Sequence, residues 1–191
     1  QADELNRTTP RTMAALLEAM QEAQVTVEGT TYPLEQPFMV VASQMPFDSQ
    51  GTYILPKVQA DRFMFCTWTD NPDLEEERAV LRKVDELDQT EVSSSISLQE
   101  ILQAREHVRA VHVSDPVLDY LLVLVRGVRA IPELASGPSP RAAISLFKGA
   151  RALAALQGRE FVLPDDVKEL AMAALIHRVQ LSMEATMSKF S

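Results

Sequence analysis

The sequence predicts an α/β segment followed by an all-α segment, on the strength of three observations. Two short apolar runs, Phe38–Ala42 and 63–65, flank a loop rich in helix and strand breakers, as is typical of strands buried on both faces. After Asn71-Pro72-Asp73 the regular patterns have helical spacing. A length of 191 residues suits one large domain or two small ones. We therefore place a boundary at residue 72, between segments 1–72 and 73–191.

The first segment should open with a helix and a β-hairpin. Apolar residues recur at helical spacing from Arg11 to about Ala23, and Thr9 with Pro10 forms a suitable helix start. Alternating residues from Gln24 to Leu34, with Gly29 at the turn, predict a hairpin. Because its strands are short, the hairpin should project from a larger body. The two apolar runs follow as strands.

The second segment should contain five helices joined by polar or Pro-rich links. Acidic residues open the first helix, where they favour the helix dipole. A Pro- and Gly-rich stretch over 131–139 predicts a loop. The predicted helices begin near Leu74, Ser97, Asp115, Pro140 and Pro164.

Composition limits the class of protein. The net charge is −9, from 18 basic and 27 acidic residues, and disfavours nonspecific nucleic-acid binding, which needs Lys and Arg to neutralise phosphates. One cysteine, Cys66, cannot form an internal disulfide and fits a reducing compartment, so we expect a cytoplasmic protein with Cys66 as core filler. No apolar run approaches the ~20 residues of a membrane span, so we expect no membrane insertion.

Three short patterns could carry chemistry. The adjacent carboxylates of Asp3 and Glu4 could divide two tasks, one holding a hydrated Mg²⁺ and the other activating a water. Asp61-Arg62 precedes a predicted strand, and Arg141 lies at a helix start, where a cation opposes the dipole and indicates an anionic partner. Each has an ordinary alternative: a solvated acidic pair, an ion pair that caps a strand, and an arginine in solvent.

Three longer stretches resemble the MoxR family of AAA+ ATPases, in the family's order and spacing. They are ADELNRTTPRTMAALLEAMQEAQVTVEGTTYPL, PFMVVASQMPFDSQGTYILPKVQADRF and GPSPRAAISLFKGARALAALQGREFVLPDDV. The resemblance runs from about Ala2 to Leu181. It implies a partial AAA+ P-loop nucleotide-binding core over 1–72, followed by a helical lid over 73–191.

The resemblance also implies roles for single residues. Asp3 would coordinate Mg²⁺, and Glu4 would polarise the water that attacks ATP. Arg62 looks like the arginine finger that reaches the γ-phosphate bound by a neighbouring subunit. Arg141 looks like the second sensor, which contacts nucleotide phosphate from the lid. The hairpin over 24–34 would face the centre of a ring.

The family consists of ring-forming, chaperone-like ATPases that act on other proteins, often ones with von Willebrand factor A domains. The resemblance therefore implies ATP and Mg²⁺ as cofactors, a homo-oligomeric and most simply hexameric ring, and protein clients. The alternative is a non-catalytic or weakly hydrolysing nucleotide-sensing scaffold that recruits a partner protein. A nucleic-acid motor is disfavoured, because no basic stripe interleaved with aromatic residues is present.

The sequence departs from the family pattern in two ways. It contains no GxxxxGK[ST] phosphate-binding loop, so we expect a fragment of a longer protein that is inactive by itself. The first sensor is usually an Asn in an ATQNP context, whereas Met45 follows Ser43-Gln44 here, and a thioether is only a weak acceptor. Either Ser43 or Gln44 substitutes for that Asn, or the full-length protein hydrolyses ATP slowly.

Overall fold

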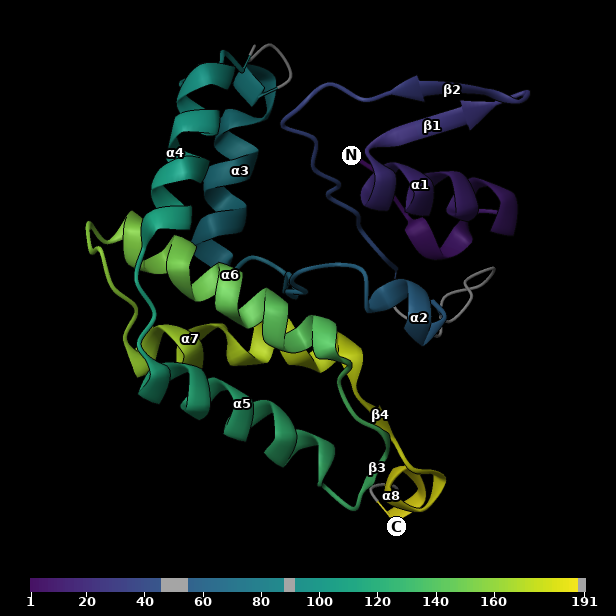
Figure 1. Ribbon diagram of the computed structural model, residues 1–191. Coiled ribbons are helices and arrows are strands. Elements are labelled where there is room, and N and C mark those ends of the chain that lie inside the picture. The colour runs from purple at the N-terminus through teal and green to yellow at the C-terminus, as the bar shows by residue number, and fades with distance from the viewer. Residues whose placement is uncertain (46–54, 88–91, 189–191) are drawn as a thin grey trace.

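The computed structural model describes residues 1–45, 55–87 and 92–188 (Figure 1). A small N-terminal unit lies beside a larger helical unit, and the short helix α2 lies between them. The N-terminal unit comprises the 3₁₀ helix η1 (Leu5–Arg7), α1 (Pro10–Glu22), β1 (Gln24–Val27) and β2 (Thr30–Pro33), and α2 spans Lys57–Ala60. The helical unit comprises α3 (Leu74–Leu87), α4 (Leu98–Ala110), α5 (Asp115–Arg129), β3 (Leu134–Ser136), α6 (Pro140–Leu156), α7 (Pro164–Leu175), the 3₁₀ helix η2 (Ile176–Arg178), β4 (Gln180–Leu181) and α8 (Met183–Ser188). No helix in these ranges is long and apolar enough to cross a membrane.

The predicted first helix and hairpin are confirmed. The Thr9 side chain caps α1 by accepting a hydrogen bond from the Thr12 N–H. Strands β1 and β2 pair antiparallel, and both turn residues have positive φ, 49° at Glu28 and 80° at Gly29, as a tight type I′ hairpin requires. Glu18 on α1 accepts hydrogen bonds from the Thr26 N–H and hydroxyl, so the hairpin is fixed on the helix that precedes it.

The two predicted buried strands are wrong. In the first apolar run only Ala42 forms a β-bridge, a parallel one with Ala2, while Met39 and Val41 are 79% and 56% exposed. A strand buried on both faces needs neighbours along its edges and above and below it, and the described residues supply one bridge alone. Residues 63–65 adopt no regular structure, and the short helix α2 that precedes them was not predicted.

The predicted helical segment is confirmed, with one correction. The expected loop over 131–139 contains strand β3, which pairs antiparallel with β4. Cys66, expected to fill the core, is only partly buried, and this burial raises the pKa of its thiol. The predicted boundary at residue 72 falls in the link between α2 and α3 and stays a prediction. This link also packs on the helical unit, because the Cys66 N–H donates to the Ala173 carbonyl at 2.9 Å.

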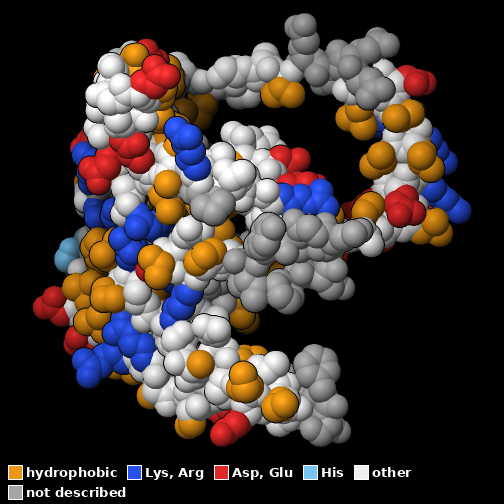
Figure 2. Space-filling model, turned by 90° about the vertical axis from the view of Figure 1, so that its right-hand side faces the viewer, with side chains coloured by type: hydrophobic (Ala, Val, Ile, Leu, Met, Phe, Trp, Pro, Cys, Tyr) orange, Lys and Arg blue, Asp and Glu red, His pale blue; other side chains and the backbone are white. Residues whose placement is uncertain are grey.

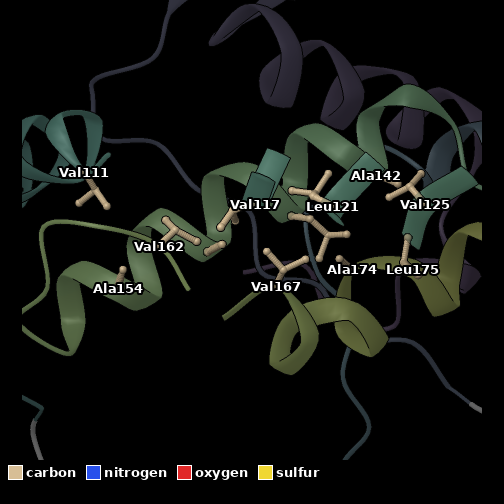
Figure 3. Close-up of a cluster of buried hydrophobic side chains, with 12 residues drawn as sticks. Val111, Val117, Leu121, Val125, Ala142, Ala154, Val162, Val167, Ala174 and Leu175 are labelled. Carbon is tan, nitrogen blue, oxygen red and sulfur yellow. The ribbon is translucent and has the colours of Figure 1, made fainter. Parts of the chain in front are cut away.

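The core of the helical unit lies between α5, α6 and α7 (Figure 3). Helix α6 presents a stripe of four residues spaced four apart, all 1% exposed or less: Ala142, Leu146, Ala150 and Ala154. The three alanines of this stripe let α5 and α7 approach α6 closely. Larger apolar residues from α5 and α7 fill the space around it, among them Leu121, Val125 and Val167.

Helices α3 and α4 stand away from this core (Figure 1). Helix α3 has no buried residue, and α4 begins with a capping box between Ser97 and Glu100. Arg151 of α6 ties α4 to the core by donating from Nε to the Val108 carbonyl. Figure 2 shows hydrophobic side chains open to solvent on one face of the molecule, beside Lys, Arg, Asp and Glu side chains.

Two helical glycines should respond to alanine in opposite ways. A Cβ at Gly149 would lie 2.6 Å from the Phe65 ring and 3.0 Å from Leu170, whereas nothing lies within 4 Å of a Cβ at Gly127. We expect Gly149→Ala to lower the free energy of unfolding by about 1–3 kcal/mol through overpacking. Gly127→Ala should raise it by about 0.5–1 kcal/mol, because alanine loses less entropy in a helix. Urea unfolding measures both, and equal stabilisation by the two variants would contradict the contact with Phe65.

Candidate functional site

The parallel bridge between Ala2 and Ala42 brings the acidic pair to the end of the first apolar run. The Ala2 N–H donates to the Val41 carbonyl at 2.8 Å, and the Ser43 N–H donates to the Ala2 carbonyl at 2.9 Å. The Ser43 hydroxyl then donates to a carboxylate oxygen of Asp3 and accepts from the Glu4 N–H at 3.0 Å. Asp3, Glu4 and Ser43 therefore form one corner, which we call the acidic corner, although about forty residues separate Ser43 from the acidic pair.

Within the acidic corner, Glu4 is held in an unusual backbone conformation. Its φ and ψ are 47° and 51°, in the left-handed region that non-glycine residues rarely adopt. Its carboxylate forms an ion pair with Arg7 at 2.7 Å, with both side chains partly exposed. An exposed pair of this kind contributes only about 0.2–1 kcal/mol, so the Glu4 carboxylate can leave Arg7 at little cost.

Asn6 fixes the chain just beyond the acidic corner, a role that the sequence did not reveal. Asn6 is buried, and its side-chain amide pairs with both backbone groups of Met45, each at 3.1 Å. Gln44 lies exposed between Ser43 and Met45. Position 45 is therefore held through its backbone, which places the segment independently of the side chain that it carries.

The donor set of the acidic corner suits Mg²⁺. Carboxylate and hydroxyl oxygens are the hard ligands that Mg²⁺ prefers, and Mg²⁺ commonly uses one or two of them together with phosphates and waters. Asp3 and Ser43 could supply those oxygens. Among residues 1–45, 55–87 and 92–188, no group of three or more His, Cys, Asp and Glu could hold a metal by itself.

A second polar cluster joins α2 to the helical unit, and Asp61 is its centre. Asp61 is 5% exposed, and the Ser139 hydroxyl lies 2.8 and 2.7 Å from its two carboxylate oxygens. Arg178 Nε lies 3.2 Å from Oδ1, and Arg141 Nη1 donates to Oδ2 at 3.4 Å. The alternative in which Asp61 caps a strand is wrong, because Asp61 follows the helix α2 and pairs with arginines of the helical unit.

Arg178 is the other half of this cluster and was not identified from the sequence. It is 1% exposed and donates to the carbonyls of Ala174, Phe63 and Asp61 at 2.6, 2.6 and 3.2 Å, and to the Ser145 hydroxyl at 3.0 Å. Burial lowers the pKa of the Arg178 guanidinium, and the Asp61 carboxylate acts in the opposite direction. We call this group of residues the Asp61–Arg178 cluster.

The two arginines predicted to contact phosphate, Arg62 and Arg141, both lie at this cluster. Arg141 opens α6, where its backbone N–H donates to the capping Ser139 side chain, and its half-exposed guanidinium reaches Asp61. Asp61 is thus an anionic partner for a cation that opposes the helix dipole. Arg62 is partly buried, and its Nε and Nη1 donate no hydrogen bond within the described part of the chain. Two unpartnered nitrogens on one guanidinium fit an anion as ligand.

Comparisons with known proteins agree with this arrangement. Residues 1–65 match the family model of the ATPase family associated with various cellular activities (AAA), and residues 126–190 match that of the AAA lid domain. YeaC of Bacillus subtilis (strain 168) is 40% identical over 185 residues, which are 96% of this chain and 58% of that protein. Chaperone MoxR1 of Mycobacterium tuberculosis is 34% identical over 199 residues, with 100% and 52% covered. The crystal structure of a candidate ATPase from Cytophaga hutchinsonii matches with a TM-score of 0.89 at 39% identity, covering 98% of this chain and 60% of that one.

These matches define a part of an AAA ATPase with a nucleotide-binding core and a helical lid. Within that class, the chain belongs to the MoxR family of AAA+ ATPases. The predicted family and fold class are confirmed. The chain spans between 52% and 60% of the length of the three relatives above, so the activity of a whole protein is a matter for proposal.

A partly buried histidine beside the Asp61–Arg178 cluster, His177, should make stability depend on pH. His177 Nε2 lies 3.0 Å from the Phe63 carbonyl, which can only accept, so the neutral ring donates there. Burial lowers the pKa of His177, the Arg178 charge adds to this, and the contacts with Phe63 and Asp61 oppose it. Between this lowered pKa and the unfolded value of about 6.5, the unfolded chain binds more protons. The free energy of unfolding should therefore fall as the pH falls below about 6.5.

Urea unfolding at pH 7.5 and at pH 5.5 measures this fall. His177→Gln keeps an N–H donor but does not titrate, so the difference between the two pH values should shrink. His107→Gln, at an exposed position of α4, is the matched control and should leave the difference unchanged. An undiminished difference in His177→Gln would show that another group causes it.

Proposed function

We propose that this chain is part of a MoxR-type ATPase that couples ATP hydrolysis to the remodelling or maturation of protein complexes. The observation that carries the proposal is the acidic corner, where Asp3, Glu4 and Ser43 meet across a parallel bridge. In open α/β sheets, ligands bind beyond the carboxyl ends of parallel strands, and this corner directly follows the parallel bridge between Ala2 and Ala42. The chaperone description of the 34% identical MoxR1 supports the remodelling role.

The acidic corner would perform the hydrolytic step. Asp3, with Ser43 beside it, would hold Mg²⁺, whose charge stabilises the phosphate oxygens when it is bound. Glu4 would leave Arg7 and accept the proton of the attacking water, which is general-base catalysis. Ser43 or Gln44 would take the place of the usual sensor asparagine, since Met45 offers only a thioether.

The two arginines at the Asp61–Arg178 cluster would act on phosphate from different subunits. Arg62 would enter the site of the neighbouring subunit and stabilise the charge on the γ-phosphate as a planar, always-charged donor. Arg141 would exchange Asp61 for a phosphate in its own subunit and so report nucleotide binding to the lid. The exposed side of Arg141 and the distance of 3.4 Å to Asp61 favour such an exchange.

The wider assembly belongs to the same proposal. The working protein would be cytoplasmic and form a homo-oligomeric, most simply hexameric ring, with clients such as von Willebrand factor A domains. The hairpin β1–β2 would face the centre of the ring. The 191-residue chain by itself would be inactive, because no GxxxxGK[ST] loop is present to hold the phosphates.

A second candidate function is a nucleotide-sensing scaffold that hydrolyses ATP weakly or not at all and recruits a partner protein. The observation that favours it is Met45, which Asn6 holds in place through the backbone alone. In this scaffold, nucleotide binding would move the lid through Arg141 without a fast chemical step.

Phosphate release by the full-length protein tests both candidates. For an ATPase, Glu4→Gln should lower kcat by about 100-fold or more, the usual contribution of a general base. Binding of a fluorescent ADP analogue with Mg²⁺ should change little. The matched control is Glu106→Gln, which removes a carboxylate from another exposed pair with an arginine three residues on, and should keep the rate.

Two other outcomes would contradict the leading proposal. Nucleotide binding by the wild-type protein without phosphate release would support the scaffold. A full rate in Glu4→Gln would mean that a different group activates the water.

A further inference from the structure

The two carbonyls that flank Arg62 share one donor. Arg178 Nη2 donates to the Phe63 carbonyl at 2.6 Å and to the Asp61 carbonyl at 3.2 Å. These residues are the immediate neighbours of Arg62 in the chain. Because a carbonyl on each side of Arg62 is held from one point, the backbone at Arg62 is fixed from both sides.

The donor itself cannot move easily. Arg178 is 1% exposed, and its remaining contacts go to the Ala174 carbonyl, the Ser145 hydroxyl and the Asp61 carboxylate. Ala174 and Ser145 belong to α7 and α6, the helices that form the core of the helical unit. The Arg62 segment is thereby attached to the rigid part of the lid.

A second set of contacts fixes the same segment at both of its ends. Lys57, at the start of α2, donates to the Ser136 hydroxyl at 2.6 Å and to the Gly137 carbonyl at 2.8 Å. The Cys66 N–H, beyond Arg62, donates to the Ala173 carbonyl. Residues 57–66 are thus bonded to the helical unit before, at and after Arg62.

From this geometry we infer that Arg178 is a positioning residue for Arg62, so that the lid of one subunit sets the arginine that its neighbour uses. The inference rests on the proposed function, in which Arg62 acts in the neighbouring site. Arg178 touches neither nucleotide nor reacting atoms. It acts through the Asp61 and Phe63 carbonyls on either side of Arg62. The Asp61 carboxylate also connects Arg178 to Arg141, so the phosphate sensor and the positioning residue share a carboxylate.

The inference predicts which subunit loses activity. Arg178→Lys keeps a positive charge for Asp61, but one ammonium nitrogen replaces three guanidinium nitrogens. It therefore cannot hold the Phe63 and Asp61 carbonyls and reach the Ala174 carbonyl at the same time. A misplacement of about 1 Å costs about 100-fold in rate, so homomeric rings of Arg178→Lys should turn over about 100-fold more slowly. The defect should lie in the neighbour's site, because that site receives the misplaced Arg62.

Mixed rings locate the defect. Full-length Arg178→Lys and full-length Glu4→Gln, each nearly inactive alone, are mixed in equal amounts and allowed to assemble. In head-to-tail rings, about one site in four combines an intact Glu4 with an Arg62 that an intact Arg178 positions. The mixture should therefore recover about a quarter of the wild-type phosphate release.

The same mixture with Arg62→Ala separates the inference from the proposed function. Recovery with Arg62→Ala but not with Arg178→Lys would overturn the inference alone, since Arg178 would then serve its own site or the fold. No recovery with either would overturn the action of Arg62 in the neighbouring site, and the inference with it. Full activity of homomeric Arg178→Lys rings would also overturn the inference.

Two further variants control for folding. Arg159→Lys disturbs another ion pair in the helical unit, the pair with buried Asp166 at 2.6 Å, and should change the rate little. If Arg178→Lys does not fold, Ser145→Ala carries the same test, because it removes one acceptor of Arg178 and leaves Arg178 in place. Its rate should fall by several-fold, and its equal mixture with Glu4→Gln should keep more than about a quarter of the wild-type rate. A mixture with only about half of the homomeric Ser145→Ala rate would place the defect in the variant's own site and overturn the inference.

Discussion

The contact between Arg178 and Asp61 is the interaction on which the arrangement of this chain depends. Two buried charges are costly unless further hydrogen bonds satisfy them, and here Ser139, Ser145 and three carbonyls do so. The loss of one partner from such a pair costs about 3–5 kcal/mol, because the other charge is left buried and alone. The contact also joins segments that lie more than a hundred residues apart, and so makes α2 and the lid one unit.

The described residues form two polar sites, for which we propose different tasks. The acidic corner of Asp3, Glu4 and Ser43 is built on one parallel bridge and would serve the nucleotide of its own subunit. Arg62 lies at the Asp61–Arg178 cluster, just after α2, and would serve the nucleotide of the next subunit. A lid that moves with its own nucleotide would then carry the neighbour's arginine with it. Such coupling between adjacent sites is what a ring that works in sequence requires.

Local signals predicted the elements that depend on local contacts. Thr9 caps α1 and Gly29 turns the hairpin because each needs only its immediate neighbours in sequence. The run Phe38–Ala42 was predicted as a strand because it is apolar, yet a strand in the middle of a sheet exists only with partners on both edges. Arg178 gave no local signal either, since its acceptors at 61 and 63 are distant in sequence. The meeting of Asp3 with Ser43 could be expected only once both were placed at the ends of neighbouring parallel segments.

Amide hydrogen exchange of the full-length protein tests most directly whether the lid holds the Arg62 segment. In Arg178→Lys, the amides of residues 57–66 should exchange about tenfold faster, which corresponds to a loss of about 1.4 kcal/mol in the free energy of local opening. The amides of the hairpin β1–β2 should keep their wild-type rates, because Glu18 and α1 hold that hairpin. Unchanged exchange over 57–66, or an equal increase in both segments, would contradict the claim that Arg178 fixes the segment that carries Arg62.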